Sequence, residues 1–172
     1  MNNYTLIKAG KEHLQTIHDM AEVAFRHTYR EMLSLDQIDY MMEWMYSLPS
    51  LEQQLESGHV YYIALQGDEP CGYISVQYEG DVEGKAMFHL HKIYILPNWQ
   101  GKGLGRILFE KALDFARTHA QGKPLAIELN MNRENPALHF YQHMGLKILR
   151  QGDFHIGNGY YMNDYILGYS ED

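Results

Sequence analysis

Glycines stand at every second position in a short stretch of this chain that lies just before an expected helix. Residues 87–96 are apolar and β-branched as in a strand, Pro97 ends that strand, and apolar residues recur at helical spacing from Leu104 onward. A helix N-terminus presents unpaired backbone N–H groups and the positive end of a dipole, and both favour an anion. The spacing therefore predicts a phosphate-binding loop, formed by Gln100, Gly101, Lys102, Gly103, Leu104, Gly105 and Arg106.

Two better-known glycine loops do not fit this stretch. A dinucleotide-binding loop requires glycine where Arg106 stands, and a Walker loop requires four residues between its glycines followed by Lys-Ser/Thr. The pattern Gln/Arg-x-x-Gly-x-Gly/Ala instead resembles the pyrophosphate loop of the GCN5-related N-acetyltransferases, the GNAT family. The resemblance implies that acetyl-CoA is the cosubstrate.

A second segment, Asn135–Leu146, begins with Asn and Pro as helices often do and ends at Gly145, where a left-handed residue can stop a helix. It resembles the Asn-x-x-Ala-x-x-Phe-Tyr-x-x-x-Gly-Phe segment of the same family, with Asn135 one position nearer to the Ala and Leu146 in place of the last Phe. The resemblance covers at least residues 60–167. It implies that Asn135 and Tyr141 lie at the coenzyme and that Tyr141 is the acid that protonates the departing thiolate.

The order of the expected elements fits one domain over residues 1–172, because the chain is too short for two ordinary domains. Strands that meet in hairpins and alternate with helices predict an α+β (mixed α/β) fold. The resemblance implies the GNAT fold, a central mixed, mostly antiparallel sheet with helices on both faces and strands splayed at the coenzyme site. Strands are expected at 4–8, 60–65, 71–78, 88–96, 125–131, 146–151 and 160–167, helices at 11–30, from 34 or 36 to near Pro49, 104–119 and 136–144, and turns at 67–70 and 80–84.

The strand before the glycine loop shifts its apolar phase. Phe88 and Leu90 are apolar at first, then Ile93 and Ile95, with Lys92 between the two pairs. A β-bulge produces such a shift, although a strand buried on both faces blurs the pattern in the same way. Strands that separate at a bulge leave backbone groups free to bind the amides of pantetheine. The resemblance accordingly implies coenzyme contacts by Ile93, Tyr94 and Ile95, with the N–H of Ile93 or Tyr94 as oxyanion donor.

Acetyl transfer to an amine requires the amine in its neutral form. The family often carries a Glu on the strand before the glycine loop, but this chain has His89 and His91 there, and we take both as candidate catalytic residues. Glu128 and Asp164 are further candidates for the base, and an amine that arrives neutral requires none. Pairs of histidines also suit a metal, but no third ligand is recognisable, so we expect no metal.

Composition narrows the classes of partner. The formal net charge of −8 argues against nucleic acid. No apolar run approaches the roughly 20 residues that span a bilayer, and the first residues do not resemble a signal peptide, so we expect no membrane and a cytoplasmic protein. Cys71 is the single cysteine and is expected to be a buried structural thiol.

The acceptor is indicated by a looser likeness. Residues 154–167 and 25–29 resemble the PaiA-type polyamine acetyltransferases, which implies a small-molecule amine such as spermidine or spermine, acetylated by direct attack in a ternary complex. The exposed-looking acids Glu31, Asp36, Asp39 and Glu43 either bind this amine or form a solvated helix face. A protein N-terminus, another small amine, or a non-catalytic acyl-CoA-binding module are the alternatives. The oligomeric state stays open, with a homodimer among the outcomes.

Overall fold

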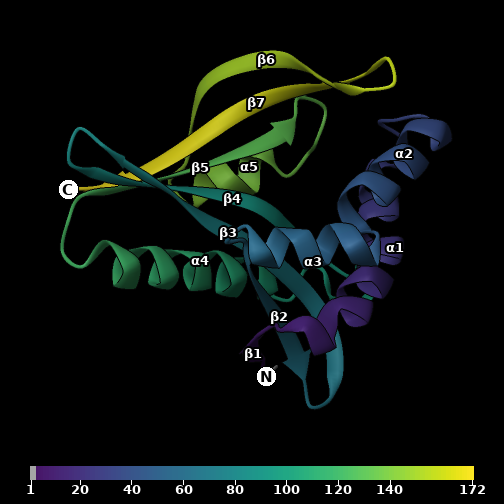
Figure 1. The fold of residues 1–172 in the computed structure, drawn as a ribbon, viewed down its shortest axis with the longest axis horizontal. Coiled ribbons are helices and arrows are strands. Elements are labelled where there is room, and N and C mark those ends of the chain that lie inside the picture. The colour runs from purple at the N-terminus through teal and green to yellow at the C-terminus, as the bar shows by residue number, and fades with distance from the viewer. Residues whose placement is uncertain (1–2) are drawn as a thin grey trace. The chain divides into compact units, whose positions relative to one another are not determined.

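The structure is a computed structural model that describes residues 3–172 and contains seven strands in that range. Figure 1 labels its main elements, and the strands are hydrogen-bonded in the order β1-β2-β3-β4-β5-β7-β6. The pair β4–β5 is parallel, whereas β1–β2, β2–β3, β5–β7 and β6–β7 are antiparallel, so the expected mixed, mostly antiparallel sheet is confirmed. In chain order the elements are β1 (Thr5–Lys8), η1 (Lys11–His13), α1 (Leu14–Tyr29), α2 (Leu35–Tyr46), α3 (Leu48–Glu56), β2 (Val60–Gln66), β3 (Glu69–Val82), β4 (Lys85–Ile95), η2 (Pro97–Trp99), α4 (Leu104–Ala120), β5 (Leu125–Asn132), α5 (Leu138–His143), β6 (Lys147–Gly157) and β7 (Tyr160–Glu171).

The chain forms two compact units. The first comprises the residues up to Gln77 together with Lys92–Ala112, and the second comprises Tyr78–His91 and Leu113–Asp172. The elements β3, β4 and α4 each contribute residues to both units. The single domain expected from the length of the chain stays a prediction.

In the first unit, helices cover both faces of the sheet. Tyr73 of β3 donates a hydrogen bond to Tyr46 at the end of α2, and Phe25 of α1 packs edge-on against the ring of Tyr46. The adjacent residue of β3, Gly72, faces Leu108 of α4 instead. Because successive residues of a strand point to opposite faces, α1–α3 and α4 lie on opposite sides of this part of the sheet.

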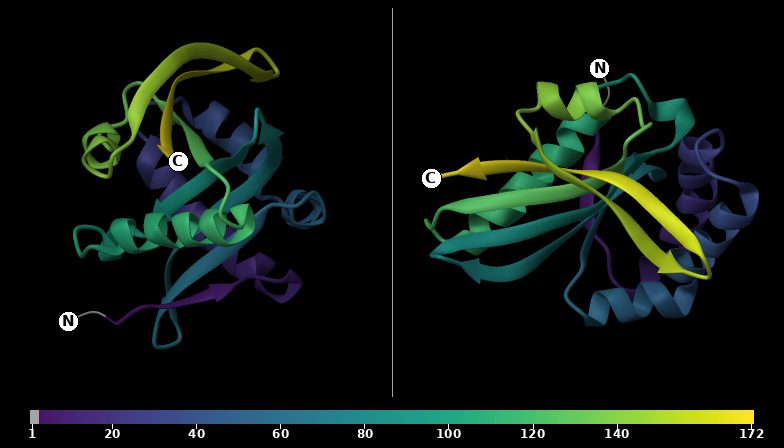
Figure 2. Two further views of the ribbon diagram at one scale, coloured as in Figure 1. Left: turned by 90° about the vertical axis from the view of Figure 1, so that its left-hand side faces the viewer. Right: turned by 90° about the horizontal axis from the view of Figure 1, so that it is seen from above.

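In the second unit, β5 lies between β4 and β7. Its parallel register with β4 runs from Ala86–Leu125 to His89–Glu128, and its antiparallel register with β7 runs on to Asn132–Asp164. Strands β6 and β7 form a long hairpin, visible in both views of Figure 2. Its turn is Asn158–Gly159, where both φ angles are positive, as a tight two-residue turn requires.

Several boundaries differ from the expectation. Strand β6 continues to Gly157, beyond its expected end at 151, and a separate helix, α3, begins at Leu48, because Pro49 fits the first turn of a helix. Two further differences lie at turns. The turn expected at 80–84 is shorter, because β3 continues to Val82 and only Glu83 and Gly84, both with positive φ, form the turn. The helix expected at 136–144 begins at Leu138, because Oδ1 of Asn135 accepts from the N–H of Ala137 at 2.9 Å and forms a local turn first. Asn135 therefore caps this turn and not the helix itself.

The burial of β4 alternates along the strand, with Ala86, Phe88, Leu90 and Lys92 buried and the residues between them less so. Phe88 packs edge-on against Phe115 of α4, and Lys92 contacts Tyr46 of α2 and Gln54 of α3. The bulge expected in this strand stays a prediction.

Candidate functional site

The glycine loop joins the end of β4 to α4 through two residues whose backbone conformations only glycine adopts readily. Gly101 has φ +75° and Gly103 has φ +81°, and a Cβ at either position would meet nothing within 4 Å. Gln100 holds the loop to the preceding strand, because its Nε2 donates to the carbonyl oxygen of Ile95 at 3.2 Å. The loop therefore has a defined backbone with open space beside it, which fits a phosphate group.

Two cations flank this loop. Lys102 is exposed, with its Nζ 5.2 Å from the centre of the Trp99 ring, and Arg106 is exposed in the first turn of α4. Within residues 3–172 neither takes part in an ion pair, so both are available to an anionic ligand. Leu104 is buried and anchors the start of α4, which leaves Gly105 beside it in the first turn. The predicted loop residues thus occupy one continuous segment at a helix N-terminus.

The strand end that carries Ile93, Tyr94 and Ile95 approaches β3 closely. A Cβ on Gly72 would lie 2.7 Å from the carbonyl oxygen of Tyr94, so this contact requires glycine. The hydroxyl of Tyr94 lies 3.3 Å from that of Tyr29, and its ring packs against Phe25 and Tyr73. The backbone expected to face the acetyl group is therefore held in place by aromatic side chains of α1 and β3.

Cys71, next to Gly72, is buried as expected, and burial raises the pKa of its thiol. Its carbonyl oxygen accepts from the N–H of Leu96 at 2.9 Å. A protonated, buried thiol is a poor nucleophile, which agrees with a structural role.

Lys92 is the functional candidate that sequence reasoning missed. Lys92 is 6% exposed. Its Nζ donates to Oε1 of Gln54 at 2.7 Å and to the hydroxyl of Tyr61. The same Nζ lies 4.6 Å from the centre of the Tyr46 ring. Burial lowers the pKa of Lys92 to about 7. The available signal is a lysine between apolar residues of an expected strand, a pattern that also fits a bulge.

The second unit holds the residues of the second motif. Tyr141 lies on α5 and is 7% exposed, and its carbonyl oxygen accepts from the N–H of Leu146 at 3.1 Å. Gly145, with φ +100°, ends this helical segment as expected. Asn135 forms the turn that precedes α5. The assignments of Asn135 and Tyr141 to the coenzyme stay predictions.

His89 and His91 lie side by side on β4, with their ring centroids 4.5 Å apart. Nδ1 of His89 is 3.8 Å from Oε1 of Glu79, and Glu128 is its partner across the parallel register with β5. Burial lowers the pKa of His89, and the nearby carboxylates of Glu79 and Glu128 oppose this shift. A neutral imidazole can accept a proton, so the chemistry of His89 suits a base.

The two further candidates for the base have different surroundings. Glu128 forms an ion pair with Arg150 at 2.7 Å, and this pairing makes its carboxylate less available as a base. Asp164 is 4% exposed, its Oδ2 accepts from Asn130 at 3.3 Å, and its Oδ1 has no hydrogen-bond partner among the described residues. Burial raises the pKa of Asp164, so proton uptake by this carboxylate is favoured relative to an exposed Asp.

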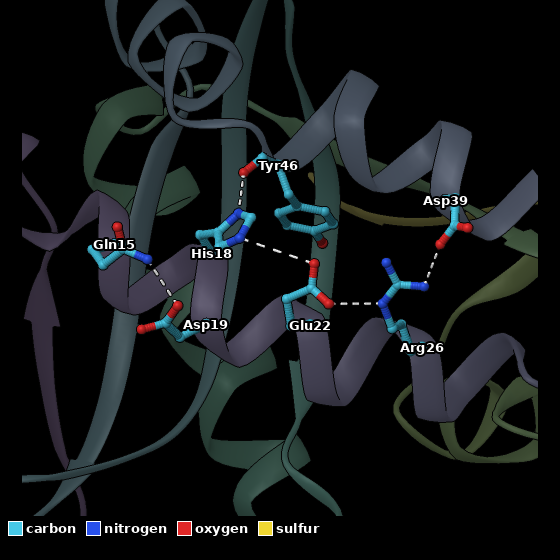
Figure 3. Close-up of polar contacts among 7 residues, drawn as sticks. All are labelled: Gln15, His18, Asp19, Glu22, Arg26, Asp39 and Tyr46. Carbon is cyan, nitrogen blue, oxygen red and sulfur yellow. Dashed lines mark hydrogen bonds and ion pairs between the residues drawn. The ribbon is translucent and has the colours of Figure 1, made fainter.

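The acidic residues expected near an amine are exposed. Figure 3 shows Arg26 of α1 between Glu22 and Asp39, with N–O distances of 2.8 and 2.7 Å. Asp39 of α2 is therefore neutralised within the protein. Asp36 and Glu43 lie on the same helix and form no ion pair within residues 3–172, which leaves both available to a cation.

Across residues 3–172 no group of three or more His, Cys, Asp or Glu side chains is arranged to hold a metal ion. His139 and His143, which have the spacing of a metal-binding pair, are both exposed on α5. In the same range no helix combines the length and apolar character needed to cross a membrane.

With this geometry in hand, comparison with known proteins identifies the class. The sequence profile of the Acetyltransferase (GNAT) family matches residues 22–146. This is most of the chain, and it includes the glycine loop and the whole of the second motif. The chain belongs to the Acetyltransferase (GNAT) family.

Individual relatives are more distant. A streptothricin acetyltransferase from Streptomyces lavendulae is 33% identical over 82 residues, which are 42% of this chain and 42% of that protein. The curated relatives are matched over 38% to 64% of their own length, so the chain spans less than two thirds of each.

Two solved structures share the fold over nearly the whole chain. The PaiA N-acetyltransferase from Thermoplasma acidophilum, in complex with coenzyme A, superposes with a TM-score of 0.77 at 20% identity over 98% of this chain and 99% of that one. A spermidine N-acetyltransferase mutant from Vibrio cholerae superposes with a TM-score of 0.65 at 21% identity over 97% and 93%. At these identities the likeness establishes the fold alone.

Proposed function

We propose that this protein transfers the acetyl group of acetyl-CoA to a primary amine, and that the amine is a polyamine such as spermidine or spermine. The glycine loop carries the first part of this proposal. Gly101 and Gly103 adopt left-handed conformations with open space beside them, at the start of α4 and next to two unpaired cations. A pyrophosphate group matches this combination of backbone, dipole and charge.

In the proposed reaction the neutral amine attacks the thioester carbonyl directly. The N–H of Ile93 or Tyr94 stabilises the oxygen as negative charge develops on it, and Tyr141 donates a proton to the departing thiolate. Free amines have a pKa of about 10.4, so the amine must lose a proton before attack. We take His89 as the base, because its lowered pKa keeps the imidazole neutral and able to accept a proton, and His91 lies beside it.

The polyamine part of the proposal is supported by charge and by the relatives. The chain has a formal net charge of −8, and Asp36 and Glu43 of α2 are exposed. A spermidine N-acetyltransferase and a PaiA N-acetyltransferase are among the proteins that share the fold. A flexible polycation gains affinity from several separate carboxylates, so an acidic surface of this kind fits it.

An amine panel with acetyl-CoA tests the acceptor. Spermidine, spermine, a monoamine of equal length and an N-terminal peptide are compared by the rate at which free coenzyme A is released. The proposal expects the highest kcat/KM for the polyamines. Turnover of the peptide with spermidine and spermine untouched would replace the polyamine with a protein N-terminus as acceptor.

A further inference from the structure

Lys92 is a buried lysine whose contacts within residues 3–172 are all with neutral groups. Its Nζ donates to the amide oxygen of Gln54 and to the hydroxyl of Tyr61, and it lies 4.6 Å and 5.1 Å from the centres of the Tyr46 and Tyr61 rings. A buried ammonium group costs free energy unless its environment compensates for the lost water. An apolar residue would avoid this cost, so the lysine calls for a role beyond packing.

The partners of Lys92 connect three elements to β4. Gln54 of α3 accepts from Lys92 and from Tyr61 of β2, and its Nε2 donates to the carbonyl oxygen of Met45 in α2 at 2.7 Å. A single amide therefore links the end of α2 to the amine of Lys92. The junction between α2 and α3 is fixed against β4 at residue 92.

Lys92 lies in β4 directly before the residues that are proposed to bind the acetyl group. Ile93 and Tyr94 follow Lys92 directly, and they carry the N–H groups that the proposed reaction assigns to the carbonyl oxygen of the thioester. Tyr94 is held on the same face, between Phe25, Tyr29 and Tyr73. Oxyanion donors lower the barrier only when their positions are fixed to a fraction of an ångström.

We propose that Lys92 is a positioning residue for acetyl transfer, which holds the backbone of Ile93 and Tyr94 in place through its hydrogen bonds to Gln54 and Tyr61. This inference rests on the proposed function, because it takes these two residues as the acetyl site. Lys92 acts through the strand and touches no reacting atom. Its loss should therefore lower kcat while the binding of acetyl-CoA is largely retained.

The first test compares Lys92→Met with Lys111→Met. Methionine keeps most of the stem of Lys92 and removes its donors. Lys111 is a matched control, because its Nζ also lies over a tyrosine of β2, 4.9 Å from the centre of the Tyr62 ring, on the opposite face. We expect kcat to fall about 10-fold to 100-fold in Lys92→Met, the scale of a misplacement near 1 Å, with KM for acetyl-CoA within about threefold. Lys111→Met should match the wild type.

Tyr61→Phe separates positioning from general loss of stability, because it keeps the ring and removes only the hydroxyl. If Lys92 acts through Tyr61, the two substitutions together should lower kcat by no more than Lys92→Met alone. Effects on log kcat that simply add, or a folded Lys92→Met with the kcat of the wild type, overturn the positioning role. Should Lys92→Met not fold, a Tyr61→Phe protein with the wild-type kcat overturns it as well.

Hydrogen exchange gives a readout that needs no turnover. In Lys92→Met the peptide covering residues 92–96 should exchange faster, whereas the peptide covering 85–89 of the same strand should keep its wild-type rate. Unchanged exchange at 92–96 overturns the inference and leaves the proposed function standing. A wild-type protein that acetylates no amine overturns the proposed function, while the exchange data still decide whether Lys92 fixes this strand.

Discussion

Nζ of Lys92 on β4 donates to Oε1 of Gln54 on α3 at 2.7 Å, in a part of the protein where the lysine has no acidic partner among the described residues. The groups that face it are the rings of Tyr46 and Tyr61 and the hydroxyl of Tyr61. Burial raises the pKa of both tyrosines, so they stay neutral at physiological pH. The amine is thus held by hydrogen bonds and aromatic faces alone.

This arrangement predicts a dependence of stability on pH. Lys92 has a pKa of about 7 in the folded protein and 10.5 as the reference value, so between these values the unfolded chain binds a proton that the folded protein does not. Stability therefore rises from pH 7 to 10.5, with a slope of up to about 1.4 kcal/mol per pH unit from this group. The stability is lost again as pH falls from 10.5 to 7, and below 7 both states bind the proton, so this group adds no further pH dependence.

Urea unfolding of the wild type, Lys92→Met and Lys111→Met over this range measures the slope. The free energy of unfolding of the wild type minus that of Lys92→Met should increase with pH above 7. The curve for Lys111→Met should run parallel to that of the wild type. Parallel curves for all three proteins would show that Lys92 titrates normally in the folded state.

The glycine loop predicts a loss of coenzyme affinity when Gly103 is replaced by Val. The side chain would occupy the open space where a phosphate oxygen is expected, which should weaken acetyl-CoA binding by about 2 kcal/mol or more. Because φ is +81° at Gly103, valine also strains the backbone there. Gly122→Val is the matched control, since Gly122 has φ +87° and the same open surroundings beyond the other end of α4.

Calorimetric titration with acetyl-CoA compares these two variants. Gly122→Val should lose stability but bind with wild-type affinity, and Gly103→Val should bind poorly while still folded. Equal affinities in the two variants would remove the loop from the coenzyme site.

Tyr141 is expected to protonate the leaving thiolate. Tyr141→Phe keeps the ring and removes the proton donor, so kcat should fall roughly 10²-fold with little change in the affinity for acetyl-CoA. Steady-state kinetics with the preferred amine measure both quantities. A kcat within about threefold of the wild type would exclude this role.

Salt should weaken the binding of the polyamine far more than it slows the chemical step. The Debye length falls from about 30 Å at 0.01 M salt to about 10 Å at 0.1 M, which screens separate carboxylates from a polycation. KM for spermidine should therefore rise with salt while kcat changes little. Replacing Asp36 and Glu43 by Asn and Gln should raise KM at low salt, and the same charge change at exposed Glu110 and Asp114 of α4, to Gln and Asn, should not. A KM that is independent of salt argues against carboxylate binding.

The boundaries that sequence reasoning placed wrongly share a physical cause. Gly80 suggested a turn, but its positive φ lies within β3, and the turn uses Glu83 with φ +53° instead. Asn135 suggested a helix cap, but its side chain closes a turn two residues before α5. In each case one residue type serves two local structures, and the residue type alone does not decide between them.

The glycine loop was predictable because its signal is local. A strand, a Pro, two glycines and a helix start follow one another, and the structure has them in that order. The surroundings of Lys92 were not predictable, since Gln54 and Tyr61 are 38 and 31 residues away in the chain. A lysine at a buried strand position indicates that other groups offset the cost of burying its amine, but the sequence does not identify those groups.

Acetyl transfer to an amine is tested by following both products in one reaction. Purified wild-type protein is mixed with acetyl-CoA and spermidine, free coenzyme A is measured with a thiol reagent, and the mass of the amine is determined at the same times. We expect one acetylated spermidine for each coenzyme A released. Binding of acetyl-CoA without acetylation of spermidine or any other amine in the panel would contradict it and indicate a non-catalytic acyl-CoA-binding protein.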